Sequence, residues 1–352
     1  MIVREGDIRF HAGSENLGPG PGSRSAGFYN TSQSLNRNIT ECFLSSIKPS
    51  NVLDGFGGTG VRGIRIQKEL GLNVTIAEPN PKSMEIIREN CKMNDVHPDL
   101  FEGRFEAAVT QDLYDYLDID PYGTPIPFIF PALSYVRNHG YIGITATDLT
   151  GLTGSTPQKT LRRYQASIEC DSFKHEMGIR LLISTIIRYA ASIDMAAYPV
   201  MSLWHSHYYR VFFRVDHGSG RADQLMDRIG IIDKYTDLTR SAPNNIEGPV
   251  WKGNLQDFKI MEEIKMPVPI VNDKAVNRYL ELFRNDDLQF LFIDLALESQ
   301  HRKRDIPPLS VVMEKLSESG ISNGRTQFSY RGIKTSDPSY AISIIDDLLE
   351  SG

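Results

Sequence analysis

The sequence predicts an α/β fold, in which a parallel sheet carries helices on both faces, two antiparallel strands close one edge, and a smaller α+β domain follows. Strand and helix patterns alternate from about residue 35 to residue 215, as in a Rossmann-like sheet. From residue 216 onward the helices become shorter and are separated by polar and proline-bearing segments. This change divides the chain into two predicted domains, residues 1–215 and residues 216–352.

The first domain begins with about thirty residues that lack a helical period and are rich in glycine and proline at 18–23; we expect a loop that could cover a site. Apolar spacing then predicts helices over residues 35–46 and 173–192. Four strands are predicted, near Val52, Val74, Tyr116 and Tyr141. Residues 199–215 predict two more strands joined by a tight turn, an antiparallel pair at the sheet edge.

The second domain ends in a helix, a strand or hairpin and another helix. These elements are predicted over residues 310–318, 325–335 and 338–349. Their order resembles a winged-helix unit, a small form common in nucleic-acid-binding proteins, although the same layout can be scaffolding.

The charge balance limits the partners that the chain can have. A net charge of −6 and an isoelectric point near 5.8 argue against indiscriminate coating of nucleic acid, which depends on lysine and arginine. A local basic groove remains open, with candidates at 162–163, at 301–304, and at Arg325, Arg331 and Lys334. No apolar run approaches the roughly 20 residues that span a bilayer, and no secretory signal is evident, so we expect a cytoplasmic protein without membrane contact.

The cysteine and histidine residues are not spaced as the ligands of a metal site would be. Cys42, Cys91 and Cys170 lie far apart and in no ligand spacing, which is typical of a reducing compartment, and we expect all three to be buried. His205 and His207 share one strand face, but no carboxylate or cysteine neighbour completes a ligand set. We therefore expect no metal.

A glycine loop follows the strand near Val52 and opens a helix. Gly55, Gly57 and Gly60 satisfy the dinucleotide pattern G-x-G-x-x-G, so the loop alone does not separate a nicotinamide cofactor from S-adenosylmethionine. Asp54, directly before the first glycine, favours the latter, because a carboxylate repels a pyrophosphate but suits an ammonium and a sulfonium. An ordinary glycine turn without a ligand is the structural alternative.

Glu78 ends the next predicted strand, about twenty residues after the loop. At that distance an acidic side chain meets ribose hydroxyls. A solvated glutamate is the alternative, but beside the glycine loop a ribose contact is the better interpretation.

A second motif, Asp120-Pro121-Tyr122-Gly123, ends the strand near Tyr116. Strand alternation places Asp118 and Asp120 on one side, with Asp120 at the carboxyl edge, where open α/β sheets bind ligands. The motif is similar to the Asp/Asn-Pro-Pro-Tyr/Phe sequence of amino-methyltransferases, in which the polar group and the adjacent carbonyl hold an exocyclic amine. A plain Asx-Pro-type turn is the structural alternative.

The residue types fit methylation of an amine on a nucleobase. The lone pair of such an amine is delocalised into the ring, so the amine needs orientation and a proton acceptor, and Asp120 can supply both. Tyr122 offers a face for stacking on the base.

Nine stretches along the chain resemble the archaeal tRNA (guanine(26)-N2)-dimethyltransferase family. They are 27–30 (GFYN), 35–38 (LNRN), 53–54 (LD) with 58–65 (GTGVRGIR), 119–123 (IDPYG), 145–148 (TATD), 175–180 (HEMGIR), 207–210 (HYYR), 248–253 (GPVWKG) and 332–335 (GIKT). The resemblance covers nearly the whole chain in order. It implies a class I methyltransferase domain over 1–215, a tRNA-binding domain over 216–352, and mono- and dimethylation of guanosine N2 at tRNA position 26.

The resemblance also implies roles for individual residues. Phe28 and Tyr122 would sandwich the guanine, while Asp120, beside Pro121, would hold and deprotonate its N2. The implied contacts to S-adenosylmethionine are Arg37, Asp54, Gly55, Gly57, Arg62, Glu78, Glu106 and Ala107. Family members often have Asp at the positions of Glu78 and Glu106, and Phe at that of Tyr122. Some have a four-cysteine zinc site, but no cysteine follows Cys170 here.

Three other functions stay open at this point. One is an amino-methyltransferase acting on rRNA or DNA through the same Asp-Pro-aromatic motif. Another is a nicotinamide-dependent oxidoreductase, against which Asp54 speaks. The third is an RNA-binding scaffold that keeps the cofactor without turnover, which the joint presence of the two motifs disfavours.

Overall fold

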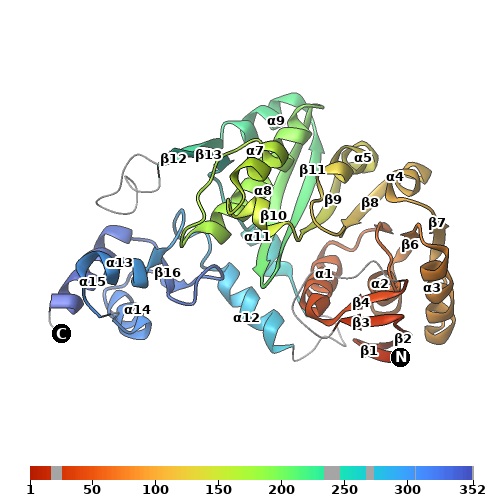
Figure 1. The fold of residues 1–352 in the computed structure, drawn as a ribbon, viewed down its shortest axis with the longest axis horizontal. Coiled ribbons are helices and arrows are strands. Elements are labelled where there is room, and N and C mark those ends of the chain that lie inside the picture. The colour runs from red at the N-terminus through yellow and green to blue at the C-terminus, as the bar shows by residue number, and fades with distance from the viewer. Residues whose placement is uncertain (17–25, 234–245, 267–272, 306, 351–352) are drawn as a thin grey trace.

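The structure is a computed structural model that describes residues 1–352 except 17–25, 234–245, 267–272, 306 and 351–352. Its centre is a seven-stranded sheet in the order β10-β11-β9-β8-β5-β6-β7 (Figure 1). The strands are β5 (Asn51–Asp54), β6 (Asn73–Glu78), β7 (Asp99–Glu102), β8 (Tyr114–Ile119), β9 (Val136–Ala146), β10 (Met195–His205) and β11 (Tyr208–His217). The strands from β9 to β7 are parallel, while β11 and β10 are antiparallel, which confirms the predicted sheet and its edge.

Helices cover both faces of this sheet. One apolar core joins it to α1 (Ser34–Ile47), α2 (Val61–Leu70) and α3 (Pro81–Asn94), and a second joins it to α4 (Phe105–Ala108), α5 (Ile129–Tyr135) and α8 (Lys174–Ala191). Neighbouring residues of β8 divide between the two cores: Tyr116 packs in the first and Leu117 in the second. Strand alternation therefore supplies both layers. Two short helices, α6 (Leu149–Leu152) and α7 (Pro157–Tyr164), follow β9. The 3-10 turns Thr31–Gln33, Val109–Gln111 and Ile126–Phe128 directly precede α1, β8 and α5.

The N-terminal segment differs from the expected loop. β1 (Ile2–Glu5) and β2 (Ile8–His11) form an antiparallel hairpin, and β3 (Ser14–Asn16) pairs in parallel with β4 (Phe28–Asn30). The outer edge of β2 is satisfied by side chains of α3, since Asn90 and Asn94 accept hydrogen bonds from the backbone of His11 (2.6 Å) and Arg9 (3.0 Å). These contacts span about eighty residues, so local pattern could not predict them. The expected glycine-rich stretch at 18–23 lies outside the described residues.

The elements that directly follow β11 pack in the apolar core on the α8 side of the sheet. In α9 (Ser219–Met226), β12 (Ile229–Asp233) and β13 (Ile246–Trp251), Leu225, Ile232 and Trp251 join the same apolar core as α8. Then α11 (Phe258–Glu263) and α12 (Lys274–Phe283) follow, and Val276 and Phe283 of α12 pack in the core of α1. The domain boundary at residue 215 stays a prediction.

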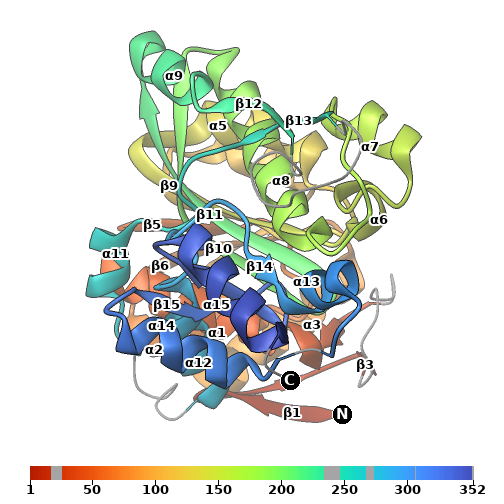
Figure 2. The ribbon, with the colours of Figure 1, turned by 90° about the vertical axis from the view of Figure 1, so that its left-hand side faces the viewer.

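The described residues from Ile293 onward form a small α+β unit at the end of the molecule opposite β7 and α3 (Figure 1), the end from which Figure 2 views it. It contains β14 (Ile293–Asp294), α13 (Leu295–Arg302), α14 (Leu309–Glu318), β15 (Asn323–Arg325), β16 (Gly332–Thr335) and α15 (Pro338–Glu350). The strands pair in the order β14-β16-β15, around an apolar core of their own. The predicted order of helix, strand pair and helix is present.

A buried ionic cluster joins this unit to α8. Lys334 of β16 donates to Glu176 of α8 at 2.8 Å, and Arg180 pairs with the same carboxylate at 2.9 Å. Asp286 lies nearby and accepts hydrogen bonds from Gln256 and Gln327, and burial raises its pKa to about 7. Buried charges remain stable only where they are paired, so the cluster ties the two parts together.

Two further observations concern the sequence expectations. Cys42 and Cys91 are buried, but the expectation for Cys170 is wrong, because that residue is exposed. Among the described residues, no helix combines the length and the apolar character that crossing a membrane requires.

Replacing Lys334 by Met tests the ionic cluster. We expect the free energy of unfolding to fall by roughly 3 kcal/mol, because the buried Glu176 carboxylate loses one of its two cationic partners and keeps only Arg180. The measurement is urea denaturation followed by circular dichroism. As a matched control, Arg137→Met breaks the exposed Arg137–Asp115 pair and should cost at most about 1 kcal/mol. Equal losses in the two variants would contradict the role of the cluster.

Candidate active site

The glycine loop has the predicted arrangement of strand, loop and helix. It connects β5 to α2, and Gly58 and Gly60 have φ angles of 56° and 78°, which favour glycine. At Gly57 an added Cβ would lie 2.7 Å from Ile76 Cγ2, so a side chain there does not fit. The loop backbone therefore packs closely on β6, which leaves no room for a side chain at Gly57.

Asp54 lies beneath this loop. Its side chain is 1% exposed, and Oδ2 accepts a hydrogen bond from the backbone N–H of Gly63 at 3.0 Å. Burial raises its pKa to about 6, although the positive charge of Arg62 acts in the opposite direction. In this position Asp54 stabilises the start of α2; it does not line the cavity described below, and its predicted cofactor contact stays a prediction.

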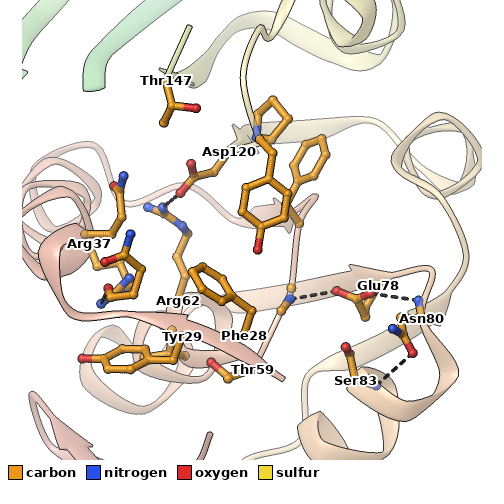
Figure 3. Close-up of a pocket in the computed structure, with 18 of the residues that line it drawn as sticks. Phe28, Tyr29, Arg37, Thr59, Arg62, Glu78, Asn80, Ser83, Asp120 and Thr147 are labelled. Carbon is orange, nitrogen blue, oxygen red and sulfur yellow. Dashed lines mark hydrogen bonds and ion pairs between the residues drawn. The ribbon is translucent and has the colours of Figure 1, made fainter. Parts of the chain in front are cut away.

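Glu78 at the end of β6 organises the other side of the loop. Its carboxylate accepts hydrogen bonds from the backbone of Gly58 at 2.9 Å and Asn80 at 2.8 Å (Figure 3). Asn80 in turn caps α3, and Ser83 of that helix accepts from Gly27 at 3.0 Å. Each Glu78 oxygen receives one of these bonds, and a carboxylate oxygen can accept two.

Arg62 of α2 joins the loop to the strand that carries the second motif. It forms an ion pair with Asp120 (Figure 3), and its Nε lies 3.4 Å from Asp118 Oδ1. On the far side, Arg210 of β11 pairs with Asp118 at 2.5 Å. Burial alone would raise the pKa of Asp118, but Arg210 and Arg62 together hold it below its ordinary value. Asp118 is therefore an anion buried between two arginines, and Asp120 is the carboxylate at the surface of the cavity, with its side chain 22% exposed.

Two backbone contacts hold the turn after Asp120. Gly123 donates to Thr147 Oγ1 at 2.8 Å, and Thr147 N donates to the Gly123 carbonyl at 2.9 Å. Gly123 has a φ of 85°, which favours glycine at this position. Thr147 thus fixes Asp120, Pro121 and Tyr122 relative to the end of β9.

Arg37 of α1 is held by a residue that the sequence analysis did not single out. Its Nε and Nη2 donate to Glu5 of β1 at 2.7 and 2.5 Å, and Nη2 also donates to the carbonyl of Asn30 at 3.1 Å. Burial alone would raise the pKa of Glu5, but Arg37 and Arg65 lower it to about 2. Glu5 could not be identified in advance because the N-terminal segment was expected to be a loop.

A cavity of about 340 Å³ collects most of these groups (Figure 3). Eight of the predicted site residues line it: Phe28, Arg37, Gly57, Arg62, Glu78, Asp120, Pro121 and Tyr122. Four do not: Asp54, Gly55, Glu106 and Ala107. Glu106 and Ala107 are exposed on α4, whose Phe105 stacks on Phe56 of the cavity wall with ring centroids 5.6 Å apart.

The sequence analysis missed several lining residues. They are Tyr29, Asn30, Gln33, Phe56, Gly58, Thr59, Val61, Pro79, Asn80, Ser83, Thr147 and His207. His207 was interpreted as a packing residue, but the turn between β10 and β11 brings it to the cavity, where burial lowers its pKa. His205 instead contacts Tyr279 at 3.0 Å. Position directly after a strand end at the carboxyl edge is the signal that could have found Thr147.

Phe28 and Tyr122 touch each other. Their ring centroids lie 5.7 Å apart with the planes at 63°, an edge contact. A base held between two rings needs about 7 Å, because each stacked contact spans about 3.5 Å. The predicted sandwich therefore requires the rings to separate and turn parallel. Tyr122 is 53% exposed, which leaves it room to move.

A cluster of three carboxylate side chains lies apart from the cavity. Oxygens of Glu169, Asp171 and Glu247 are within 4.8 Å of one another, a spacing that could hold an ion, but none of the three lines the cavity. The expectation that the protein needs no metal stays a prediction.

The buried carboxyl of Asp54 gives a pH-dependent prediction. Its pKa of about 6 exceeds the ordinary 3.8, so the native state binds the proton more tightly than the unfolded state does. This tighter binding stabilises the native state fully below about pH 4, and the stabilisation is lost as the pH rises through 6. Asp54→Asn removes the titration and keeps an acceptor for Gly63. Relative to the wild type, the free energy of unfolding of the variant should rise by about 2 kcal/mol from pH 4 to pH 7 in urea titrations. A difference that does not change with pH would contradict the raised pKa.

Comparisons with known proteins agree with this geometry. The family model described as N2,N2-dimethylguanosine tRNA methyltransferase matches residues 21–346. The tRNA (guanine(26)-N(2))-dimethyltransferases of Thermoplasma volcanium and Thermoplasma acidophilum are each 43% identical to the chain, the first over 93% of both chains and the second over 95% of this chain and 94% of its own.

A solved structure is similar over nearly the full length. Trm1 from Pyrococcus horikoshii, in complex with S-adenosyl-L-methionine, matches with a TM-score of 0.83 and 26% identity, and 99% of each chain is covered. The sheet of the present structure therefore has the class I methyltransferase form. The chain belongs to the N2,N2-dimethylguanosine tRNA methyltransferase family.

Proposed function

We propose that the protein is an S-adenosylmethionine-dependent methyltransferase that mono- and dimethylates N2 of guanosine 26 in tRNA. The observation that carries this function is the meeting of Asp120 and the ring of Tyr122 with the glycine loop and Glu78 around one cavity. Membership of the family supports both the reaction and the substrate.

The residues present fit the cofactor. The bare backbone of Gly57 and Gly58 permits the close approach of a nucleoside, and Glu78 retains acceptor sites for ribose hydroxyls. Arg37 lines the cavity with its guanidinium held in place by Glu5, which suits a carboxylate such as that of a bound amino acid. When bound, S-adenosylmethionine supplies an electrophilic methyl group on sulfur.

Asp120 orients the amine and accepts its proton. Arg62 donates to Oδ2, and we assign the other oxygen, Oδ1, to an N–H of the guanine amine. The carbonyl of Pro121, one residue on, can accept a second N–H. Directing both N–H bonds into the protein points the nitrogen toward the methyl group, and the proton that the nitrogen loses on methylation passes to Asp120.

The base reaches this position only after leaving its stack in the tRNA. Separation of Phe28 and Tyr122 provides the slot for it, and stacking on both rings replaces part of the stacking that the base loses. The predicted domain 216–352 holds the body of the tRNA through its shape and phosphates. The oligomeric state is open, and the cytoplasm is the predicted compartment.

Nucleoside mass spectrometry tests the reaction and its site together. The purified protein is incubated with S-adenosylmethionine and unmodified tRNA transcripts that carry G or A at position 26. We expect N2-methylguanosine and then N2,N2-dimethylguanosine in the G26 transcript only. Methylation of rRNA or DNA with indifference to tRNA would replace the proposed substrate.

Substitution of Asp120 separates chemistry from cofactor binding. Asp120→Asn keeps the size of the side chain, and Asp120→Ala removes it; kcat should fall by roughly 10²–10⁴-fold or more, because orientation and proton acceptance are both impaired. Affinity for S-adenosylmethionine, measured by calorimetry, should change little, because Arg62 keeps its ion pair with Asp118 in both variants. A variant that loses cofactor binding together with turnover would contradict the role assigned to Asp120.

A further inference from the structure

Three basic residues share one face of the short helix α7. Lys159, Arg162 and Arg163 are spaced by three and four positions, so their side chains emerge on the same side. The helix packs against α6 and α8 beyond the end of β9 (Figure 2). This concentration of positive charge occurs in a chain whose net charge is −6.

The cations outnumber the anion that they contact. Lys159 and Arg163 both form ion pairs with Asp148, which is buried, while the two cationic side chains are 25% and 36% exposed. Arg162 is exposed. One carboxylate cannot neutralise three cations, so a surplus of positive charge remains at the surface.

Asp148 also contacts the residues that hold the turn over residues 120–124, which carries Asp120 and is called the catalytic turn below. The hydroxyl of Tyr164, the last residue of α7, donates to Asp148 Oδ2 at 3.1 Å and lies 3.2 Å from Thr124 Oγ1. Thr124 follows Gly123, and Thr147, which holds Gly123 through two hydrogen bonds, directly precedes Asp148. The path from the surface cations to the turn of Asp120 is thus a short series of direct contacts.

We propose that α7 binds the phosphate backbone of the RNA substrate and that Asp148 and Tyr164 position the catalytic turn in response. A phosphate beside Arg162 and Arg163 takes up the surplus charge and immobilises Arg163 and Lys159 against Asp148. The fixed carboxylate then orients the Tyr164 hydroxyl and, through Thr124, the turn that carries Asp120. The inference rests on the proposed function in taking RNA as the substrate.

The phosphate contact is tested with Arg162→Gln. This side chain takes part in none of the ion pairs to Asp148, so its loss should weaken RNA binding without breaking those pairs. We expect a raised KM for tRNA and a slope of log affinity against log salt that is smaller in magnitude by about one. Arg137→Gln is the matched control: it makes the same change at the start of β9, the end of that strand away from α7, and should alter none of these values.

The positioning role is tested with Tyr164→Phe, which keeps the buried ring and removes the hydroxyl. The expected result is a fall in kcat of about tenfold, as for the loss of one buried hydrogen bond, with unchanged KM for tRNA and unchanged affinity for S-adenosylmethionine. A merely structural role would instead lower the thermal stability and leave kcat per folded molecule unaffected, which would overturn this part of the proposal.

The wild-type protein in the same assay keeps the two proposals distinguishable. If it methylates G26 tRNA but Arg162→Gln behaves as Arg137→Gln does, α7 does not contact the RNA and the inference fails while the function stands. If the wild type methylates no tRNA but binds the cofactor, the proposed substrate fails first.

Discussion

The structure depends on how the guanidinium of Arg62 is paired. A buried cation remains stable only with complete partners, and this one takes them from Asp118 and Asp120, on the strand next to the glycine loop. Asp118 in turn requires Arg210 from the antiparallel edge strand. The start of α2, the end of β8 and the start of β11 must therefore meet in one arrangement. These ion pairs therefore hold the glycine loop beside the turn that carries Asp120.

Local pattern was sufficient to predict the central sheet. The alternation of strands and helices, the glycine loop after β5 and the apolar period of α8 each depend on residues close in sequence. The strand pattern also predicted that Glu78 and Asp120 lie at the carboxyl edge of the sheet, because parallel strands end there together. The adjacency of the two motifs follows from the pairing of β5 with β8.

Contacts between distant residues could not be predicted in the same way. Glu5 becomes important only because Arg37, thirty-two residues later, folds against it. The turn between β10 and β11 brings His207 to the cavity. Both strands were predicted, but the position of their turn relative to the cavity was not. Asp54 has the right spacing for a ligand, yet burial directs it to the backbone of α2. Spacing identifies a candidate carboxylate, but packing decides which way its oxygens point.

In the role proposed for Asp120, its contact with Arg62 bears on how many methyl groups are added. With Oδ2 committed to Arg62, a substrate amine needs only one N–H to engage Oδ1. Unmodified guanine has two and its monomethyl form still has one, so both can be held for transfer. The dimethyl form has none, and its nitrogen loses its hydrogen bond to the carboxylate. The same geometry that admits a second round thus provides its own stop, and the finished product is the species held least tightly.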